Sequence, residues 1–199
     1  MEQAFLRIGW YTQGTDCLGP DSRFAIWVQG CRKRCKGCIA QSLQSFDGGQ
    51  AISVAELAEE ILKSGTDGLT ISGGEPFLQA DAIAILLEKV KSARHELGVI
   101  IYSGMKYEEL LEDSSAQKVL DYTDLLIDGE YIQELDDNRA MRGSSNQRMI
   151  FLSSRYTAED MPEKRKNKLI FYDDKFRMIG IPTEETKRAM SLLRKQRED

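Results

Sequence analysis

Two short, almost wholly apolar runs, Leu97 to Tyr102 and Asp124 to Ile127, constrain the fold of this chain most. Runs of this kind fit strands buried on both faces, as in a parallel sheet under helices. The residues around them have helical periodicity: apolar positions recur at helix spacing over 53–64 and 79–94, and 107–122 is mostly helical. Alternating strands and helices predict an α/β fold with a parallel sheet.

Three further segments complete the predicted sheet. Ala4 to Tyr11 and Arg23 to Gln29 are rich in β-branched and aromatic residues, which favours strands, and Gly68 to Ser72 is a short strand before a glycine turn. Ser53 and Glu56 have the spacing of a capping box at the start of the first helix. The sequence therefore predicts that the sheet is built mainly from the first two thirds of the chain.

The end of the chain has a separate pattern. Lys168 to Tyr172 and Lys175 to Ile179 predict a hairpin that turns at Asp173-Asp174. Thr183 is a candidate cap for a last helix, which we expect to run to about Gln196, with basic Lys195 and Arg197 near its end. We therefore expect a core domain over 1–154 and a small hairpin-helix extension over 155–199.

Chain length limits the architecture further. The chain has 199 residues, whereas a complete eight-stranded β/α barrel needs about 250. We therefore predict a partial β/α barrel, open on one side, with the extension packed on it.

Composition excludes several classes of protein. With 41% hydrophobic and 30% charged residues, the chain is globular rather than disordered, and a net charge of -5 argues against a broad nucleic-acid face. Because we find neither an apolar run of about 20 residues nor a signal peptide, we expect a cytoplasmic protein with no membrane partner. Cytoplasmic thiols stay reduced, so clustered cysteines there are more often metal ligands or catalysts than disulfides.

The cysteine loop carries the main chemical signal. Cys31, Cys35 and Cys38 follow the second strand with the spacing C-x3-C-x2-C. Three thiolates on one tight loop can hold three corners of a 4Fe–4S cluster, and a missing fourth ligand leaves one iron open for reaction. Basic residues within the loop are expected to offset the cluster's negative charge and to favour thiolate formation.

Two other interpretations of these cysteines remain open. Structural zinc needs four ligands; the single histidine, His95, is far away in sequence, but Cys17 is a possible fourth ligand. The alternative of free buried cysteines is weakened by the polar, basic loop. Cys17 is otherwise expected to be an ordinary loop cysteine.

The cysteine loop after a first strand resembles the radical S-adenosylmethionine superfamily. The resemblance implies that Cys31, Cys35 and Cys38 hold a 4Fe–4S cluster whose open iron binds S-adenosylmethionine. One electron then splits this molecule into methionine and a 5′-deoxyadenosyl radical. It also implies that the cofactor is contacted by residues beside the third cysteine and by the glycine-rich turn, which are Gly37, Cys38, Ile39, Gly73, Gly74 and Glu75.

Two more polar turns end the next predicted strands, at Ser103-Gly104 and Asp128-Gly129. Ligands of open α/β sheets bind at the carboxyl ends of the strands. We therefore expect Ser103 to hydrogen-bond the cofactor's carboxylate or ribose, and Asp128 to face the substrate channel.

A longer match indicates one branch of the superfamily. The runs Ile26 to Gly30, Asp128 to Tyr131 and Arg142 to Arg148, together with Gly37, resemble the activating enzymes of anaerobic (class III) ribonucleotide reductase, over roughly residues 5–152. This resemblance implies an enzyme that generates a glycyl radical on its partner reductase and takes electrons from a low-potential donor such as flavodoxin or ferredoxin. Glu75 stands where these activases often carry Asp, and the tail from about Arg155 extends beyond them.

Two other functions compete with this hypothesis. One is a radical S-adenosylmethionine enzyme that modifies a small molecule or a peptide. The other is an iron–sulfur or zinc module without catalysis, which the three-ligand loop and the glycine turns disfavour.

Overall fold

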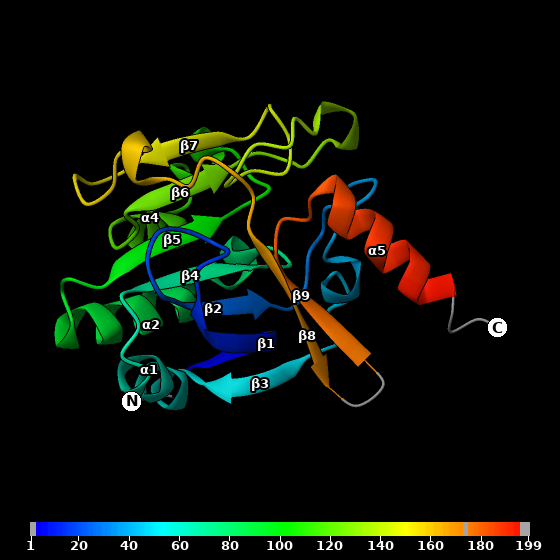
Figure 1. Cartoon of the computed structure of the whole chain (residues 1–199). Coiled ribbons are helices and arrows are strands. Elements are labelled where there is room, and N and C mark those ends of the chain that lie inside the picture. Colours follow the sequence, from blue (N-terminus) through cyan, green and yellow to red (C-terminus); the bar gives the residue numbers. More distant parts are fainter. Residues whose placement is uncertain (1–2, 173–174, 196–199) are drawn as a thin grey trace.

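The computed structural model describes residues 3–172 and 175–195, and a seven-stranded sheet forms its centre (Figure 1). The strand order is β3-β1-β2-β4-β5-β6-β7, in which β2, β4, β5 and β6 are parallel neighbours and the outer pairs are antiparallel. The strands are β1 Phe5–Thr15, β2 Arg23–Val28, β3 Gln50–Ser53, β4 Gly68–Gly73, β5 Gly98–Tyr102, β6 Leu125–Asp128 and β7 Arg148–Phe151.

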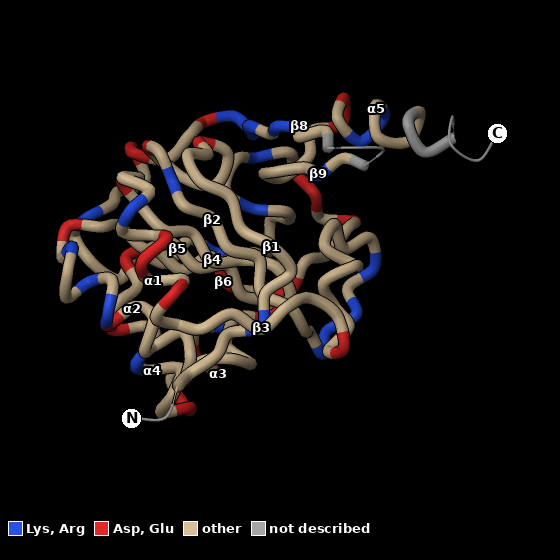
Figure 2. Tube along the Cα trace, turned by 90° about the horizontal axis from the view of Figure 1, so that it is seen from below, with Lys and Arg blue, Asp and Glu red and all other residues tan. Residues whose placement is uncertain are grey.

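Two layers flank this sheet, one on each face. The helices are α1 Val54–Lys63, α2 Ala80–Ala93, α3 Tyr107–Leu110, α4 Ser114–Leu120 and α5 Glu184–Lys195, and a second, two-stranded sheet is made of β8 Asn167–Tyr172 and β9 Lys175–Gly180. Figure 2 shows α1, α2 and α4 on one side of the large sheet and β8, β9 and α5 on the other. No helix of the described residues is both long and apolar enough to cross a bilayer.

Residues alternate between the two faces of the central strands. In β2, Phe24 and Ile26 pack in the main core with the helices, whereas Ala25 and Trp27 pack in a second cluster with Ile179 of β9. This period of two is what a strand dictates, and it explains why both faces of β2 are buried.

The α/β class and the parallel strands predicted from sequence are confirmed. The edge strands β3 and β7 were not predicted, because each has only four residues and lacks a strong strand pattern. The predicted capping box is wrong: Ser53 does precede α1, but its side chain makes no cap hydrogen bond. The sheet has open edges at β3 and β7, and the curvature of a partial barrel stays a prediction.

The hairpin and last helix are present. The hairpin's predicted turn at Asp173-Asp174 lies outside the described residues, as do Gln196 and Arg197. Thr183 caps α5 as expected, since the backbone N–H of Thr186 donates to its hydroxyl at 3.2 Å.

A fully buried arginine stabilises the end of the sheet opposite the cysteine loop. Arg23, at the start of β2, is 0% exposed and donates to the Thr70 hydroxyl at 2.6 Å, the Tyr156 hydroxyl at 2.9 Å and nearby carbonyls. Gly68 and Gly98 stand against this group: an added Cβ would meet the guanidinium carbon and the Tyr156 ring carbon, each at 2.6 Å. Side chains are therefore absent at these two positions because Arg23 and Tyr156 fill the space.

Candidate functional site

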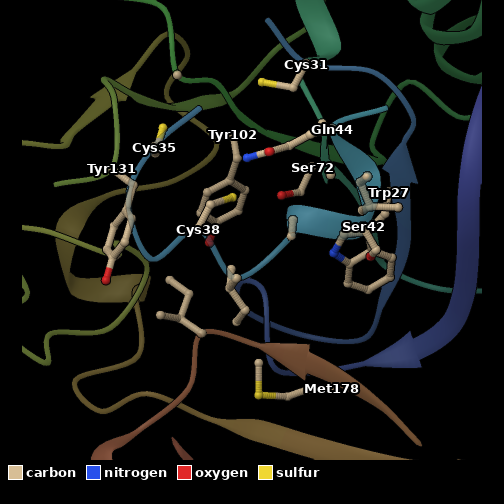
Figure 3. Close-up of a pocket in the computed structure, with 18 of the residues that line it drawn as sticks. Trp27, Cys31, Cys35, Cys38, Ser42, Gln44, Ser72, Tyr102, Tyr131 and Met178 are labelled. Atoms are coloured by element: carbon tan, nitrogen blue, oxygen red, sulfur yellow. The ribbon is translucent and has the colours of Figure 1, made fainter. Parts of the chain in front are cut away.

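The three loop cysteines line one cavity of about 620 Å³ at the carboxyl ends of the central strands (Figure 3). Cys31, Cys35 and Cys38 are free thiols of intermediate burial. Backbone hydrogen bonds fix the loop: the N–H of Cys31 donates to the carbonyl of Gln44 at 3.1 Å, and that of Cys38 donates to Cys35 at 3.2 Å. The chain thereby presents three thiol side chains to the same cavity.

The glycine turn after β4 lies directly beside this loop. Gly73 and Gly74 both line the cavity, but the space that a side chain would need is already filled by backbone. A Cβ on Gly73 would lie 2.5 Å from the Val28 carbonyl oxygen, and one on Gly74 would lie 2.7 Å from the carbonyl carbon of Gly30. The glycines therefore allow the turn to pack against the residues that precede Cys31. The sequence analysis had explained them instead by contact with a ligand.

Glu75 extends a buried carboxylate toward the next strand end. It is 3% exposed and accepts hydrogen bonds from the Ser103 hydroxyl at 2.9 Å, the Gly104 N–H at 2.8 Å and the Phe77 N–H at 3.2 Å. Burial raises its pKa, and these three donors oppose the rise. Ser103 lines the cavity as expected, but its hydroxyl is already committed to Glu75. This pairing joins the ends of β4 and β5.

Asp128 does not face the cavity, which corrects the expectation from sequence. Its side chain is 0% exposed and is absent from the cavity lining. It accepts hydrogen bonds from the Tyr107 N–H at 2.7 Å and from Arg148 Nε at 2.9 Å, and Arg148 also pairs with Glu108. A buried carboxylate is stable only with such partners, so Asp128 has a structural position under the strand end.

Two of the runs that carried the family resemblance, the one that begins at Asp128 and the one from Arg142 to Arg148, lie against each other and are joined by hydrogen bonds. Ser144 accepts from the Ile132 N–H at 3.2 Å, Asn146 donates to the Glu130 carbonyl at 2.8 Å, and Gln147 donates to the Gly129 carbonyl at 2.8 Å. The polar run after residue 142 therefore fixes the loop after β6, which brings Tyr131 to the cavity wall.

The loop's basic residues are not the dominant influence on the pKa values of Cys31 and Cys35. Burial raises the pKa of Cys31, and burial together with nearby Glu130 raises that of Cys35 to about 11. Lys33 is paired with Glu130 at 3.6 Å, so its charge is partly neutralised. The charge of Arg34 does lower the pKa of Cys31, as predicted, but burial outweighs it. The net shift disfavours the thiolates of Cys31 and Cys35, so ligand binding has to displace their protons.

The donor set fits a cubane cluster better than a single ion. Within residues 3–172 and 175–195, no three His, Cys, Asp or Glu side chains converge closely enough to hold one metal ion. Each thiolate of a 4Fe–4S cluster bonds a different iron, so convergence on one point is not required. Cys17 is absent from this cavity and lines a separate small one beside Lys166, which removes the fourth ligand that the zinc interpretation needed.

Several residues that line the cavity were not predicted from the sequence. Gly37 and Ile39 line the cavity as expected, but so do Trp10, Trp27 and Tyr102. The two tryptophan rings stack with centroids 3.7 Å apart. Their positions within predicted strands identified them as sheet residues, but nothing in the local pattern distinguished them from ordinary core.

A family model and several named relatives match this chain. The family described as "4Fe-4S single cluster domain" matches residues 17–150. Proteins named "Anaerobic ribonucleoside-triphosphate reductase-activating protein" from Enterobacteria phage T4 and Vibrio cholerae are 34% and 36% identical to this chain over 136 and 138 residues. These matches cover 66% and 65% of this chain and 85% and 87% of the relatives.

Among solved structures, QueE from Escherichia coli is similar at a TM-score of 0.38 and 20% identity, covering 50% of this chain and 53% of that chain. This likeness is too partial to bear on fold or function.

Proposed function

This chain belongs to the family of anaerobic ribonucleoside-triphosphate reductase-activating proteins, and on that premise we propose that it generates a glycyl radical on a partner reductase. It is a radical S-adenosylmethionine enzyme with a 4Fe–4S cluster. When bound and reduced, the cluster supplies the electron that breaks a sulfur–carbon bond of S-adenosylmethionine, and the resulting 5′-deoxyadenosyl radical takes a hydrogen atom from a glycine.

One observation carries this proposal: three free thiols from a single loop line the same cavity as the glycine turn and Glu75. We assign Cys31, Cys35 and Cys38 as the cluster ligands. The cavity, at about 620 Å³, lies in the size range of small-molecule sites. It therefore has room for a cofactor at the cysteine loop.

The remaining cavity residues bind and orient the cofactor in this proposal. Gly37 and Ile39 flank the last cysteine, and Gly73, Gly74 and Glu75 form the adjoining wall. Ser103 acts through Glu75, whose orientation it fixes, rather than by a free hydroxyl. Asp128 has no place in the proposed site, because Arg148 and the backbone occupy its carboxylate.

The target reductase is the anaerobic ribonucleotide reductase, as the family names state. A low-potential protein such as flavodoxin or ferredoxin is the proposed electron donor. We propose that residues 1–154 form a core domain whose sheet has the curvature of a partial barrel, and that residues 155–199 form an extension. Four free thiols support a reducing compartment such as the cytoplasm.

The test is anaerobic reconstitution with iron and sulfide, reduction with dithionite, and addition of S-adenosylmethionine. We expect 5′-deoxyadenosine that depends on the reductant, and a glycyl radical EPR signal when the co-encoded reductase is added. A fully loaded protein whose cluster EPR spectrum is unchanged by S-adenosylmethionine would contradict the proposal. Product formation with a small molecule and never with the reductase would favour the other enzymatic hypothesis.

A further inference from the structure

The cofactor cavity has a wall that the family match does not include. The match to the family model ends at residue 150. The cavity of the cysteines is nevertheless also lined by later residues, namely Met178 of β9 and Ile181, Pro182, Lys187 and Met190. Figure 3 shows Met178 in the same close-up view as Cys38 and Trp27. In this chain, one side of the cavity is therefore made by the C-terminal extension.

The extension is fixed to the core at its centre by apolar packing. Ile179 of β9 is 1% exposed and lies in a cluster with Leu18, Ala25, Trp27 and Leu43. Trp27 and Leu43 also line the cavity. Because β9 alternates between its two faces, burying Ile179 determines the position of its neighbour Met178.

A buried arginine fixes the second half of the extension. Arg165, whose side chain is 1% exposed, donates to the Pro182 carbonyl at 3.0 Å and to the Gly143 carbonyl at 3.2 Å. It also pairs with Asp136 at 2.7 Å, and Lys187 of α5 reaches the same carboxylate at 2.8 Å. The segment between β9 and α5 is thus joined to the loop after β6, on the rim of the cavity.

The chemistry of this wall suits the less polar part of a ligand. Met178, Ile181, Pro182 and Met190 contribute thioether and aliphatic surface. The two cations that the described residues contribute to this wall have partners: Lys187 is paired with Asp136, and the guanidinium of Arg177 lies over the ring of Trp10, 5.0 Å from its centroid. Polar groups and sulfur ligands gather instead on the cysteine loop and the glycine turn. A ligand held by its polar end at the cysteines would meet an apolar surface on the extension.

We propose that the C-terminal extension completes the S-adenosylmethionine-binding cavity of this chain, with Met178 and Ile181 as contact residues and Arg165 as the positioning residue. This inference rests on the proposed function, since it takes S-adenosylmethionine as the ligand. It predicts that cofactor binding depends on residues beyond the family match, and that the same residues shield the cluster from solvent.

The first test is cofactor binding to the cluster-loaded protein, measured by anaerobic equilibrium dialysis with S-adenosylhomocysteine. Met178→Trp fills the cavity and should weaken binding about tenfold or more, as overpacking of a fitted site does. Leu192→Trp is the matched control, because it adds the same side chain to α5 at a position that is 64% exposed and outside the cavity. Equal binding by the wild-type protein and Met178→Trp would overturn the proposal.

The second test needs no S-adenosylmethionine. Arg165→Met removes the donors that fix the extension, so iron release to the chelator bathophenanthroline should become about tenfold faster, because weakened local structure opens more often. Release at the wild-type rate, in a variant with wild-type circular dichroism, would contradict shielding by the extension. If this variant does not fold, Met178→Trp decides alone. A cluster-loaded wild-type protein that binds no S-adenosylhomocysteine would instead refute the proposed function.

Discussion

Gly74→Ala tests whether the glycine turn positions the site. The added methyl group would lie 2.7 Å from the carbonyl carbon of Gly30 and 3.0 Å from its nitrogen, and closer still to its oxygen. All three atoms are backbone, directly before Cys31, so no flexible side chain can move aside. The turn and the cysteine loop have to separate.

The size of that separation follows from the contact distances. The carbonyl carbon of Gly30, 2.7 Å away, has to move by about 0.7 Å to reach the 3.4 Å at which ordinary contact begins, and the closer oxygen makes this a lower bound. Overpacking of this kind costs about 1–3 kcal/mol of stability. Misplacing a bound reactant by about 1 Å can lower a rate about 100-fold. We therefore expect Gly74→Ala to fold and to lose most of its 5′-deoxyadenosine formation.

Gly104→Ala is the matched control, because Gly104 also lines the cavity. Its added methyl group would lie 2.8 Å from Cδ of Lys33, a flexible side chain that can rotate away. We expect iron content after reconstitution and the rate of 5′-deoxyadenosine formation to stay within about threefold of wild type. Equal rates for both variants, at equal iron content, would refute the reasoning about backbone crowding.

Three further predictions follow from contacts in the structure. Alanine at any of the three loop cysteines should abolish cluster-bound iron, measured colorimetrically, whereas Cys17→Ala should retain it; iron loss in the Cys17 variant would contradict the ligand assignment. Arg148→Met leaves the buried carboxylate of Asp128 without its cation, so its urea midpoint should fall further than that of Lys63→Met, which breaks an exposed pair; equal shifts would exclude a structural role for the buried pair. Burial alone would raise the pKa of Asp136, but hydrogen bonds from two cations lower it to about 2, so the folded state binds its proton less readily than the unfolded state. The stability from this group is present above about pH 4 and is lost as the pH falls toward 2, so acid unfolding of cluster-free Asp136→Asn should lack that part of the wild-type pH dependence.

The sequence predicted the central strands and helices because their signals are local. The almost wholly apolar β5 and β6 fit strands buried on both faces, and α1 has a strong apolar stripe. The strands β3 and β7 depend on pairing with β1 and β6, which are distant along the chain, so four-residue segments could not reveal them.

The residues of the site likewise fall into two groups: those that local motifs predicted and those whose positions depend on packing. The cysteine spacing and the glycine turn are local motifs, and the structure brings both to one cavity. The position of Asp128 was wrong because a strand end predicts only the edge of the sheet; whether the side chain points into the cavity depends on Arg148 and Tyr107. The contribution of Met178 depends on how the extension packs, which no local pattern in β9 encodes.

The group around Arg23 has a consequence for the evolution of the fold. Its guanidinium occupies the space of a side chain at Gly68, and Tyr156, which it hydrogen-bonds, occupies that of Gly98. A larger residue at either glycine is therefore tolerated only if the buried group shrinks in the same lineage. An alignment of homologues should show positions 23, 68, 98 and 156 substituting together, while neighbouring core positions vary independently. Such covariation would identify this end of the sheet as one inherited unit, distinct from the cysteine loop at the opposite end.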